Sequence, residues 1–438
     1  MWAVTAELIY SGGSFRADQA LVIDGDRISA VVDARAVPGD MEVDDWGHVA
    51  VLPGTVNAHG HAFQSLLKGF ADDRSFESWR DEVLYPFSER LDGRDLYAGA
   101  LFAFSEALLS GTTTTVDFFY IHDNGNDNAE RVIRAAKDVG IRLVLARTFY
   151  DLEAPTKAPQ RYREAAVDAA ERCRDLAEEF SDDPHVYVQP APHSLHAASP
   201  ETVRIALELA RELDCPYHLH VAEARYERER IEDLYGSPPV KLLAGEGLLD
   251  ERLIAIHAVW LDDEELELLA LSQAGVVHCP GANAFLGDGI AKVPEMLRRR
   301  IRVALGPDGG CANNRQSVFD EMRTATVVAK ARLTDGSALG AATVLKLGTI
   351  AGAEMLGVPS GSIEPGRFAD LVALDLNDLS LQPLETLPYQ VINSMQSTAI
   401  AKVMVGGELV VEDGVLRRVD PAEVRARVTE ATEGWRRP

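Results

Sequence analysis

The chain has 438 residues, of which 46 % are hydrophobic and 26 % charged, as is usual for a globular protein with a large core. It carries 69 Asp and Glu against 43 Lys and Arg, which gives a formal net charge of −26. A surface with this charge repels nucleic acid and anionic membranes, so we expect a small-molecule substrate and neither of those partners.

Cysteine spacing and the lengths of the apolar runs argue against a disulfide-rich, secreted or membrane-spanning protein. The four cysteines are widely spaced and form no CxxC pair, so a disulfide framework is not expected. The N-terminal segment MWAVTAELIYSGGSF lacks the basic and apolar regions of a signal peptide. No apolar run reaches the ~18 residues of a membrane span. We therefore expect a cytoplasmic protein.

Both ends of the chain have the pattern of short strands joined by turns. Residues 20–32 (ALVIDGDRISAVV) and residues 401–416 (AKVMVGGELVVEDGVL) each contain two apolar runs around a turn, which predicts two hairpins. We predict that residues 1–52 and 365–438 together form one small β-sandwich.

The middle of the chain, residues 53–364, alternates apolar runs with amphipathic helical stretches. Repeated alternation of this kind predicts a parallel (β/α)8 barrel, with a doubly wound open sheet as the alternative. The predicted strands are Val51–Asn57, Thr112–Phe118, Arg142–Thr148, Val186–Pro190, Tyr217–Val221, Leu253–Ala258, Gly275–Cys279 and Ile301–Leu305.

Histidines and a carboxylate follow the predicted strands, at the end of a barrel where active sites lie. His59 and His61 follow the first strand and Asp308 follows the eighth, and these two strands are neighbours in a closed barrel. His220 lies on the fifth strand. Three imidazoles and one carboxylate suit zinc with one position left for water, and iron and manganese are alternatives. The fourth strand offers His193 and no lysine to bridge two metals, so a single ion is expected.

Five stretches carry a family resemblance, namely LPGTVNAHGHAFQ, HLHVAE, IAIHAVW, ALGPDGGCANN and GSIEPGRFADLVALD. They resemble the amidohydrolase superfamily, in particular its mononuclear zinc deaminase and chlorohydrolase branch, from about residue 20 to about residue 415. The resemblance implies a homodimer. It also implies the metal ligands His59, His61, His220 and Asp308 and the catalytic pair Glu223 and His257.

The chemistry of these residues agrees with that role. Zinc lowers the pKa of a bound water towards ~7, and Asp308 can both ligate and accept a proton from that water. Glu223 lies three residues beyond His220, where it can protonate an imine nitrogen, and His257 can polarise the attacking oxygen. We expect a metal-dependent aminohydrolase that attacks an amidine-type C=N carbon and releases ammonia. A catalytically inactive scaffold is the non-enzyme alternative, and it predicts loss of a ligand or of the catalytic pair.

The first candidate substrate is a small formimino compound. The chain resembles N-formimino-L-glutamate deiminase in HAFQ, SWRDE, DFFYIH, PHSLHA and NAFLGDGI. By this resemblance, the pocket is lined by Gln64, Arg80, Tyr120 and His193. At His196 that family has an arginine that binds a substrate carboxylate, and imidazole replaces a bidentate guanidinium poorly.

The second candidate is a nitrogen heterocycle. The stretch ALGPDGGCANNRQSVFDEMR is similar to S-adenosylhomocysteine and methylthioadenosine deaminases, and the triazine hydrolases that release chloride or alkylamine are a further alternative. The nucleoside deaminases carry a glutamate that binds ribose hydroxyls where this chain has Ser88. A free purine, pterin or triazine would not need that glutamate. Arg147 is a further candidate for substrate binding, with a salt-bridged arginine as the alternative.

Overall fold

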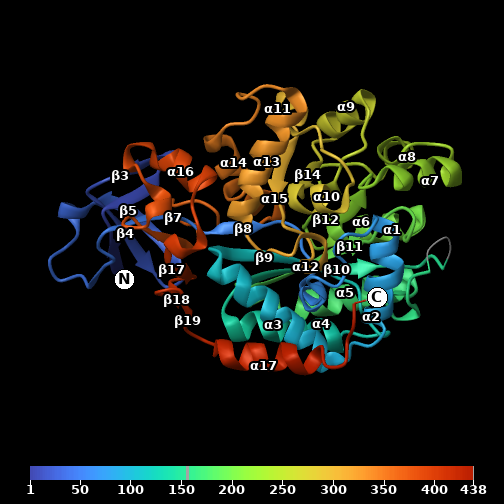
Figure 1. The fold of residues 1–438 in the computed structure, drawn as a ribbon, viewed down its shortest axis with the longest axis horizontal. Helices are drawn as coiled ribbons and strands as arrows, with labels where there is room; N and C mark the ends of the chain where they lie inside the picture. The colour runs from blue at the N-terminus through green and yellow to red at the C-terminus, as the bar shows by residue number, and fades with distance from the viewer. Residues whose placement is uncertain (154–156, 438) are drawn as a thin grey trace.

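The computed structural model describes residues 1–153 and 157–437 and consists of a barrel and a smaller β-sandwich (Figure 1). The barrel strands are β8 (Thr55–Asn57), β9 (Thr112–Phe119), β10 (Arg142–Phe149), β11 (Val186–Pro192), β12 (Tyr217–Val221), β13 (Leu253–His257), β14 (Gly275–His278) and β15 (Arg302–Leu305). They pair in parallel as two sheets with the orders β11-β10-β9-β8 and β12-β13-β14-β15.

The two sheets close on each other at both seams. At one seam Ser194 and His220 form a parallel bridge, and at the other the Ala58 amide donates to the Leu305 carbonyl over 3.0 Å. The predicted (β/α)8 barrel is therefore confirmed, and the doubly wound open sheet is not the fold.

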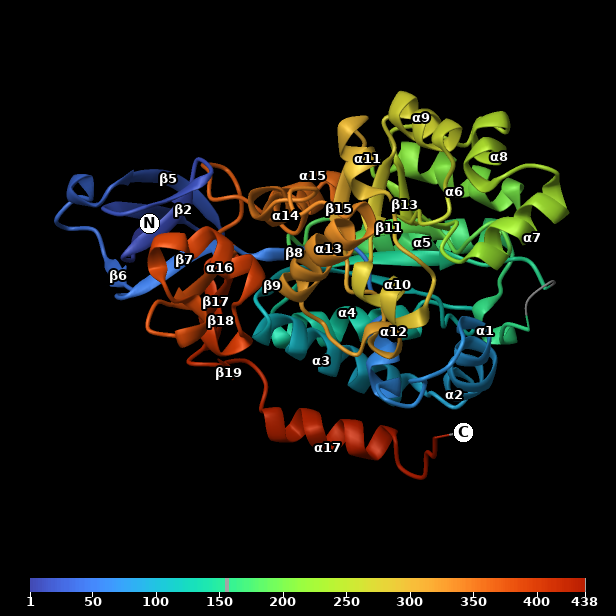
Figure 2. The same ribbon diagram turned by 45° about the horizontal axis from the view of Figure 1, so that its top comes forward.

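Helices follow the strands along the chain and cover the outside of the barrel (Figure 2). Their amphipathic patterns bury one face against the strands. They are α3 (Gly93–Leu109), α4 (Asp127–Val139), α5 (Ala166–Glu179), α6 (Pro200–Glu212), α7 (Arg225–Tyr235), α8 (Pro239–Gly245), α9 (Asp263–Ser272), α10 (Pro280–Leu286), α11 (Val293–Arg298), α12 (Gly310–Asn313), α13 (Val318–Leu333), α14 (Ala341–Leu347) and α15 (Ile350–Leu356).

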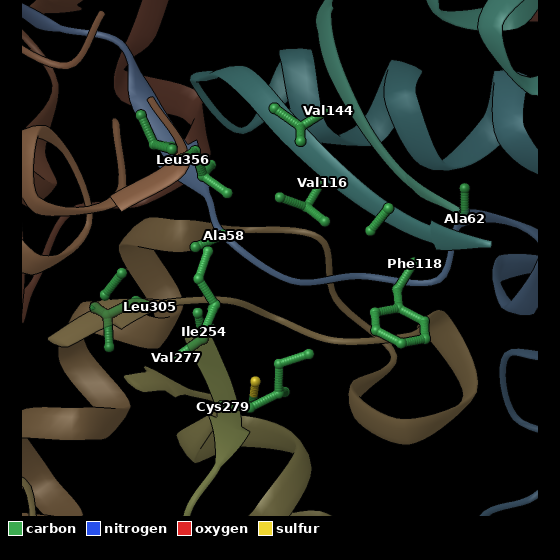
Figure 3. Packing of buried hydrophobic residues seen from close by; sticks show 14 of the residues in the cluster. Ala58, Ala62, Val116, Phe118, Val144, Ile254, Val277, Cys279, Leu305 and Leu356 are labelled. Carbon is green, nitrogen blue, oxygen red and sulfur yellow. The ribbon is translucent and has the colours of Figure 1, made fainter. Parts of the chain in front are cut away.

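A continuous cluster of buried apolar side chains holds the barrel together. Strand residues supply part of it, including Val116, Val144, Ile254, Val277 and Leu305 (Figure 3). Burial of such side chains contributes about 1.5–3 kcal/mol each, which makes this packing the main stabilising contribution to the barrel.

The first predicted barrel strand, Val51–Asn57, is wrong in extent. The apolar run divides at Gly54 into β7 (Val49–Pro53), which belongs to the sandwich, and the short barrel strand β8. A Cβ at residue 54 would lie 2.1 Å from the Thr113 hydroxyl oxygen, so glycine is required where the chain crosses from one part to the other.

The sandwich is built from segments of both chain ends. One sheet has the order β5-β4-β1-β6 and contains β1 (Trp2–Thr5), β4 (Gln19–Asp24), β5 (Arg27–Asp33) and β6 (Val43–Asp45). The other has the order β19-β18-β17-β16-β7-β2-β3 and adds β2 (Leu8–Ser11), β3 (Ser14–Arg16), β16 (Leu371–Asp375), β17 (Ile400–Val405), β18 (Glu408–Glu412) and β19 (Val415–Leu416). Both predicted hairpins are present, as β4–β5 and β17–β18.

Two further segments pack on the barrel. A cover segment, residues 62–88, crosses the barrel and contains the short elements η2 (Ala62–Leu67), α1 (Phe76–Ser78), η3 (Trp79–Leu84) and α2 (Tyr85–Ser88). The C-terminal helix α17 (Pro421–Ala431) lies along α3, and not in the sandwich expected for residues 365–438 (Figure 1). Its packing continues to Trp435, whose ring contacts Phe87 in α2.

Among the described residues, no helix has the length and apolar character that crossing a bilayer requires.

Candidate active site

The ends of the barrel strands bring imidazoles and carboxylates together. His59 and His61 follow β8, His220 lies on β12, and Asp308 follows β15. The chain turns sharply where β13 and β15 end, because His257 and Asp308 have φ values of 71° and 67° in the left-handed region. Non-glycine residues adopt this conformation rarely, and such strain is concentrated at functional sites.

Three of these imidazoles and the Asp308 carboxylate lie close together. The Nε2 atoms of His59 and His61 lie 3.3 Å and 3.5 Å from Oδ1 of Asp308. One donor atom from each of His59, His61 and His220 lies within 4.8 Å of the other two. All four residues are buried, so the cluster lies at the base of the site and away from bulk water.

The hydrogen bonds of the cluster fit a bound metal ion. Nδ1 of His61 and Nδ1 of His220 each donate over 2.7 Å to the carbonyls of Phe118 and His193, which leaves the Nε2 atoms free to ligate. Both ring nitrogens of His59 are buried and have no hydrogen-bond partner among the described residues. Burial lowers the pKa of His61 to about 3, so its imidazole is neutral, as a ligand must be. Three nitrogens and one carboxylate oxygen form a metal-binding cluster.

Glu223 and His257 lie beside this cluster. Nε2 of His257 is 3.4 Å from Oε1 of Glu223 and 3.9 Å from Oδ2 of Asp308. Burial raises the pKa of Glu223 well above its usual range, and the charges of Asp288 and Asp308 raise it further. Burial and the neighbouring carboxylates therefore favour the protonated, neutral form of Glu223 next to the cluster.

A cavity opens over the cluster, with about 600 Å³ of unoccupied space including its mouth. Five residues expected to bind substrate line it, namely Gln64, Arg80, Tyr120, His193 and His196. Further lining residues are Phe76, Trp79, Leu84, Tyr85, Tyr150, Tyr162 and Tyr226. The walls are therefore largely aromatic, which suits a flat or compact organic substrate.

Arg80 and His196 are two basic residues of the cavity that lie outside the metal cluster. Arg80 donates to the Tyr226 hydroxyl over 3.0 Å and to Oδ1 of Asp81 over 2.7 Å. His196 instead faces a carboxylate, since its Nδ1 lies 3.6 Å from Oε1 of the buried Glu227. Arg80 is thus the guanidinium that a substrate anion in this cavity would meet.

Arg147 does not line the cavity, which corrects the expectation that it binds substrate. Its buried guanidinium forms an ion pair with Glu164 at 2.8 Å and donates to Asn126 over 3.0 Å. These partners lie outside the barrel, towards α4 and α5. The alternative of a salt-bridged arginine describes this residue.

Sequence reasoning missed several cavity residues, including Phe76, Trp79, Tyr162 and Tyr226. They come from the cover segment, from the loop after β10 and from α7, where no strand pattern marks them. Ser88, which stands where nucleoside deaminases have a glutamate, is fully buried and is not among the lining residues.

The known proteins that are similar to this chain are amidohydrolases and deaminases. The Amidohydrolase family matches residues 50–410. A 5-methylthioadenosine/S-adenosylhomocysteine deaminase of Haloarcula marismortui is 34 % identical over 97 % of both chains. A 5'-deoxyadenosine deaminase of Methanothermobacter thermautotrophicus is 33 % identical over 94 % of this chain and 93 % of its own.

Solved structures share the fold. The zinc-bound adenosine deaminase from Xanthomonas campestris has a TM-score of 0.90 at 29 % identity, covering 99 % of this chain and 98 % of its own. Atrazine chlorohydrolase from Arthrobacter aurescens, complexed with zinc, has a TM-score of 0.92 at 23 % identity, covering 98 % of this chain and 100 % of its own. The second likeness bears on the fold alone.

Proposed function

The chain belongs to the amidohydrolase family, and we propose that it is a zinc-dependent aminohydrolase that releases ammonia from an amidine-type carbon. The observation that carries the proposal is the convergence of three imidazoles and Asp308 beside Glu223, a buried carboxyl whose pKa is raised. When bound by His59, His61, His220 and Asp308, zinc supplies the Lewis acidity that ionises a water near neutral pH. Iron or manganese would supply the same chemistry.

The residues of the chain divide the proton transfers between them. Asp308 accepts a proton from the attacking water, and Glu223 donates its proton to the nitrogen of the C=N bond. His257 faces both carboxylates and stabilises the oxygen that adds to the carbon. Asp308 then passes its proton to the amino group, the C–N bond breaks and ammonia leaves. The hydroxyl left on the carbon returns its proton to Glu223 and becomes a carbonyl, so one water is consumed and both carboxyl groups are regenerated.

A 6-aminopurine-type ring is the first substrate candidate. The relatives named above are deaminases of adenosine derivatives, and the cavity is lined by tyrosines, Phe76 and Trp79, against which a flat ring can stack. The amino-bearing carbon of such a ring is an amidine carbon, as the reaction requires.

A formimino compound with a carboxylate is the second candidate. The observation that favours it is Arg80, whose guanidinium lies on the cavity wall with no second arginine nearby among the lining residues. Gln64 also donates to the Tyr120 hydroxyl over 2.8 Å, so these two polar residues are held in one orientation. Arg80 could bind the substrate carboxylate in place of its contact with Tyr226.

One experiment tests the reaction and divides the candidates. The metal content of the purified protein is measured, and ammonia and chloride release are then followed with adenosine derivatives, free purines, pterins, triazines and formimino-amino acids. We expect about one zinc per chain. We also expect ammonia release with either the adenosine derivatives or the formimino-amino acids. Glu223→Gln should lose activity by 10²–10⁴-fold, whereas Glu267→Gln on the exposed face of α9 should not. Chloride release alone, or no turnover by a zinc-loaded protein, would contradict the proposal.

A further inference from the structure

The ring of His257 contacts different groups through its two nitrogens. Nε2 points to Glu223 and Asp308, as described above, while Nδ1 lies 3.1 Å from Nδ2 of Asn283. Asn283 is fully buried on α10, the helix that follows β14. The Asn283 amide thus lies on the Nδ1 side of the His257 ring, away from the metal cluster.

Asp288 fixes which end of the Asn283 amide faces His257. Burial raises the pKa of Asp288 to about 7, and a hydrogen bond from the Asn283 side chain opposes that rise. Oδ1 of Asn283 has no partner among the described residues. Above that pKa, where Asp288 is ionised, turning the amide over would place Oδ1 against the carboxylate and leave two acceptors facing each other. The amide nitrogen therefore faces both Asp288 and His257 and uses one hydrogen on each.

The loop that carries Asp288 is itself held in place. Its backbone amide donates to the Asn283 carbonyl over 2.9 Å, and its carbonyl accepts from Nε1 of Trp260 over 2.6 Å. Gly289 has a φ of 120°, and a Cβ there would approach Val259 to 3.1 Å. The carboxylate therefore cannot easily turn away from the amide that it orients.

From this arrangement we propose that Asn283 is a positioning residue that fixes the proton of neutral His257 on Nε2. A nitrogen that accepts a hydrogen bond from an amide must carry its lone pair, so Nδ1 is the unprotonated nitrogen. The proton on Nε2 then points at the space between Glu223 and Asp308. His257 can donate a hydrogen bond there to the adding oxygen, and it cannot serve there as a base. The expected kinetic effect rests on the proposed aminohydrolase function, whereas the position of the proton does not.

The sharpest test exchanges the two side chains. In Asn283→Asp/Asp288→Asn the carboxylate faces His257 and the amide stands behind it, with composition and net charge unchanged. The new carboxylate at residue 283 accepts a hydrogen bond, so the imidazole proton should move to Nδ1. A matched control exists in the sandwich, where Asn377 donates to Asp375 over 2.9 Å on an exposed turn. The control variant is Asn377→Asp/Asp375→Asn.

Nitrogen NMR of protein labelled with 15N-histidine reads the proton directly, with the His257 signals assigned by their loss in His257→Gln. We expect Nε2 to be protonated in the wild type, in the sandwich control and in Asp288→Asn, whose new amide oxygen can still accept a hydrogen bond from Asn283. We expect Nδ1 to be protonated in the exchanged variant. Protonation of Nδ1 in the wild type, or of Nε2 in the exchanged variant, would overturn the proposal. The wild-type spectrum decides the point even if the exchanged variant folds poorly.

Kinetics then tests the role in the reaction. Loss of one preorganised donor costs about 10²–10³-fold in kcat, so the exchanged variant should lose about 100-fold in kcat with little change in KM or zinc content. Asp288→Asn keeps the Asn283 amide and should retain kcat within about tenfold. An exchanged variant with a moved proton and an unchanged kcat would refute the positioning role. If the wild type turns over none of the candidates, the proposed function fails, and the NMR result still decides where the proton lies.

Discussion

The hydroxyl of Tyr162 donates a hydrogen bond to Oγ of Ser88 over 2.5 Å, and Ser88 in turn donates to the carbonyl of Tyr85 over 2.9 Å. Both hydrogen bonds hold Ser88 within the protein, behind the cavity wall that Tyr85 and Tyr162 form. Position 88, where the sequence resemblance to nucleoside deaminases implied a ribose-binding group, therefore presents no group to a substrate.

Turnover of any nucleoside should therefore not depend on the ribose diol. We predict that kcat/KM for 5'-deoxyadenosine and for its 2',3'-dideoxy analogue differ by about threefold or less. A site built to bind a hydroxyl rejects the analogue that lacks it by about 10⁴-fold, because its own polar groups are left unpaired. The measurement is ammonia release at matched concentrations of the two compounds. A hundred-fold preference for the diol would show that another residue binds it.

Metal removal should abolish activity and lower stability together. Dialysis against a chelator should remove ammonia release, and one equivalent of zinc should restore it. A ligand at 1,000 times its Kd stabilises the folded state by about 4 kcal/mol, so the melting temperature should rise on zinc addition. His59→Ala should lose both responses, because His59 has both ring nitrogens buried and unpartnered within the described chain. His48→Ala, on the exposed surface of the sandwich, should keep both.

The pH dependence of activity should report the proton on Glu223. Since burial and nearby carboxylates raise its pKa, the acid form persists to a higher pH than in an ordinary glutamic acid and is lost as pH rises through that raised pKa. We predict a fall in kcat/KM on the alkaline side of the profile. The fall should be absent from the residual activity of Glu223→Gln, whose amide does not titrate. An alkaline limb that persists unchanged in this variant would assign it to another group.

Asp117 should make the stability of the protein depend on pH. Burial raises its pKa to about 7; its Oδ1 accepts from the Ala62 amide over 2.7 Å, and its Oδ2 has no partner among the described residues. The unfolded chain loses this proton near pH 4 and the folded chain near pH 7. Between those values the folded state holds more protons, so the free energy of unfolding falls as pH rises.

Asp117→Asn removes this fall in the free energy of unfolding, because an asparagine side chain does not titrate. Relative to wild type, its free energy of unfolding should rise between pH 4 and pH 7, by at most about 4 kcal/mol, and stay level above pH 7. Urea unfolding at several pH values, with both proteins in the same zinc state, measures the difference. Asp182→Asn, at an exposed position, should show no such trend. A constant difference across the range would mean that Asp117 is ionised in the folded protein throughout.

Some parts of the fold and site could be predicted because the sequence marks them locally. Apolar runs that end in His59, His220 or Asp308 identify strands and the barrel end at which they meet. The break at Gly54 could not be predicted, because Val49–Asn57 reads as one buried run. Arg147 was misplaced because all eight residues of β10 are buried, so burial does not tell the inner face from the outer. Tyr162 and Tyr226 reach the cavity only through tertiary packing, which no periodicity records.

The C-terminal segment should determine how the cover segment shapes the cavity. The Trp435 ring lies 4.6 Å from Phe87 and 5.8 Å from Phe70, centroid to centroid, and Phe87 is two residues from the lining residue Tyr85. Trp435→Ala removes a largely buried ring, and Trp→Ala changes in packed sites cost about 3–5 kcal/mol. Because Trp435 packs against the cover segment, we expect a higher KM and faster hydrogen exchange in residues 62–88, with a smaller change in kcat.

Trp46→Ala provides the matched control for that change. Trp46 is as buried as Trp435 but lies in the sandwich, where its Nε1 donates to Asp44 over 2.8 Å. It should lower the melting temperature without changing KM or exchange in the cover. Equal effects of both variants on KM would mean that Trp435 acts only through global stability. A KM change confined to Trp435→Ala would mean that the last residues of the chain support the wall on which Arg80 and Tyr85 meet the substrate.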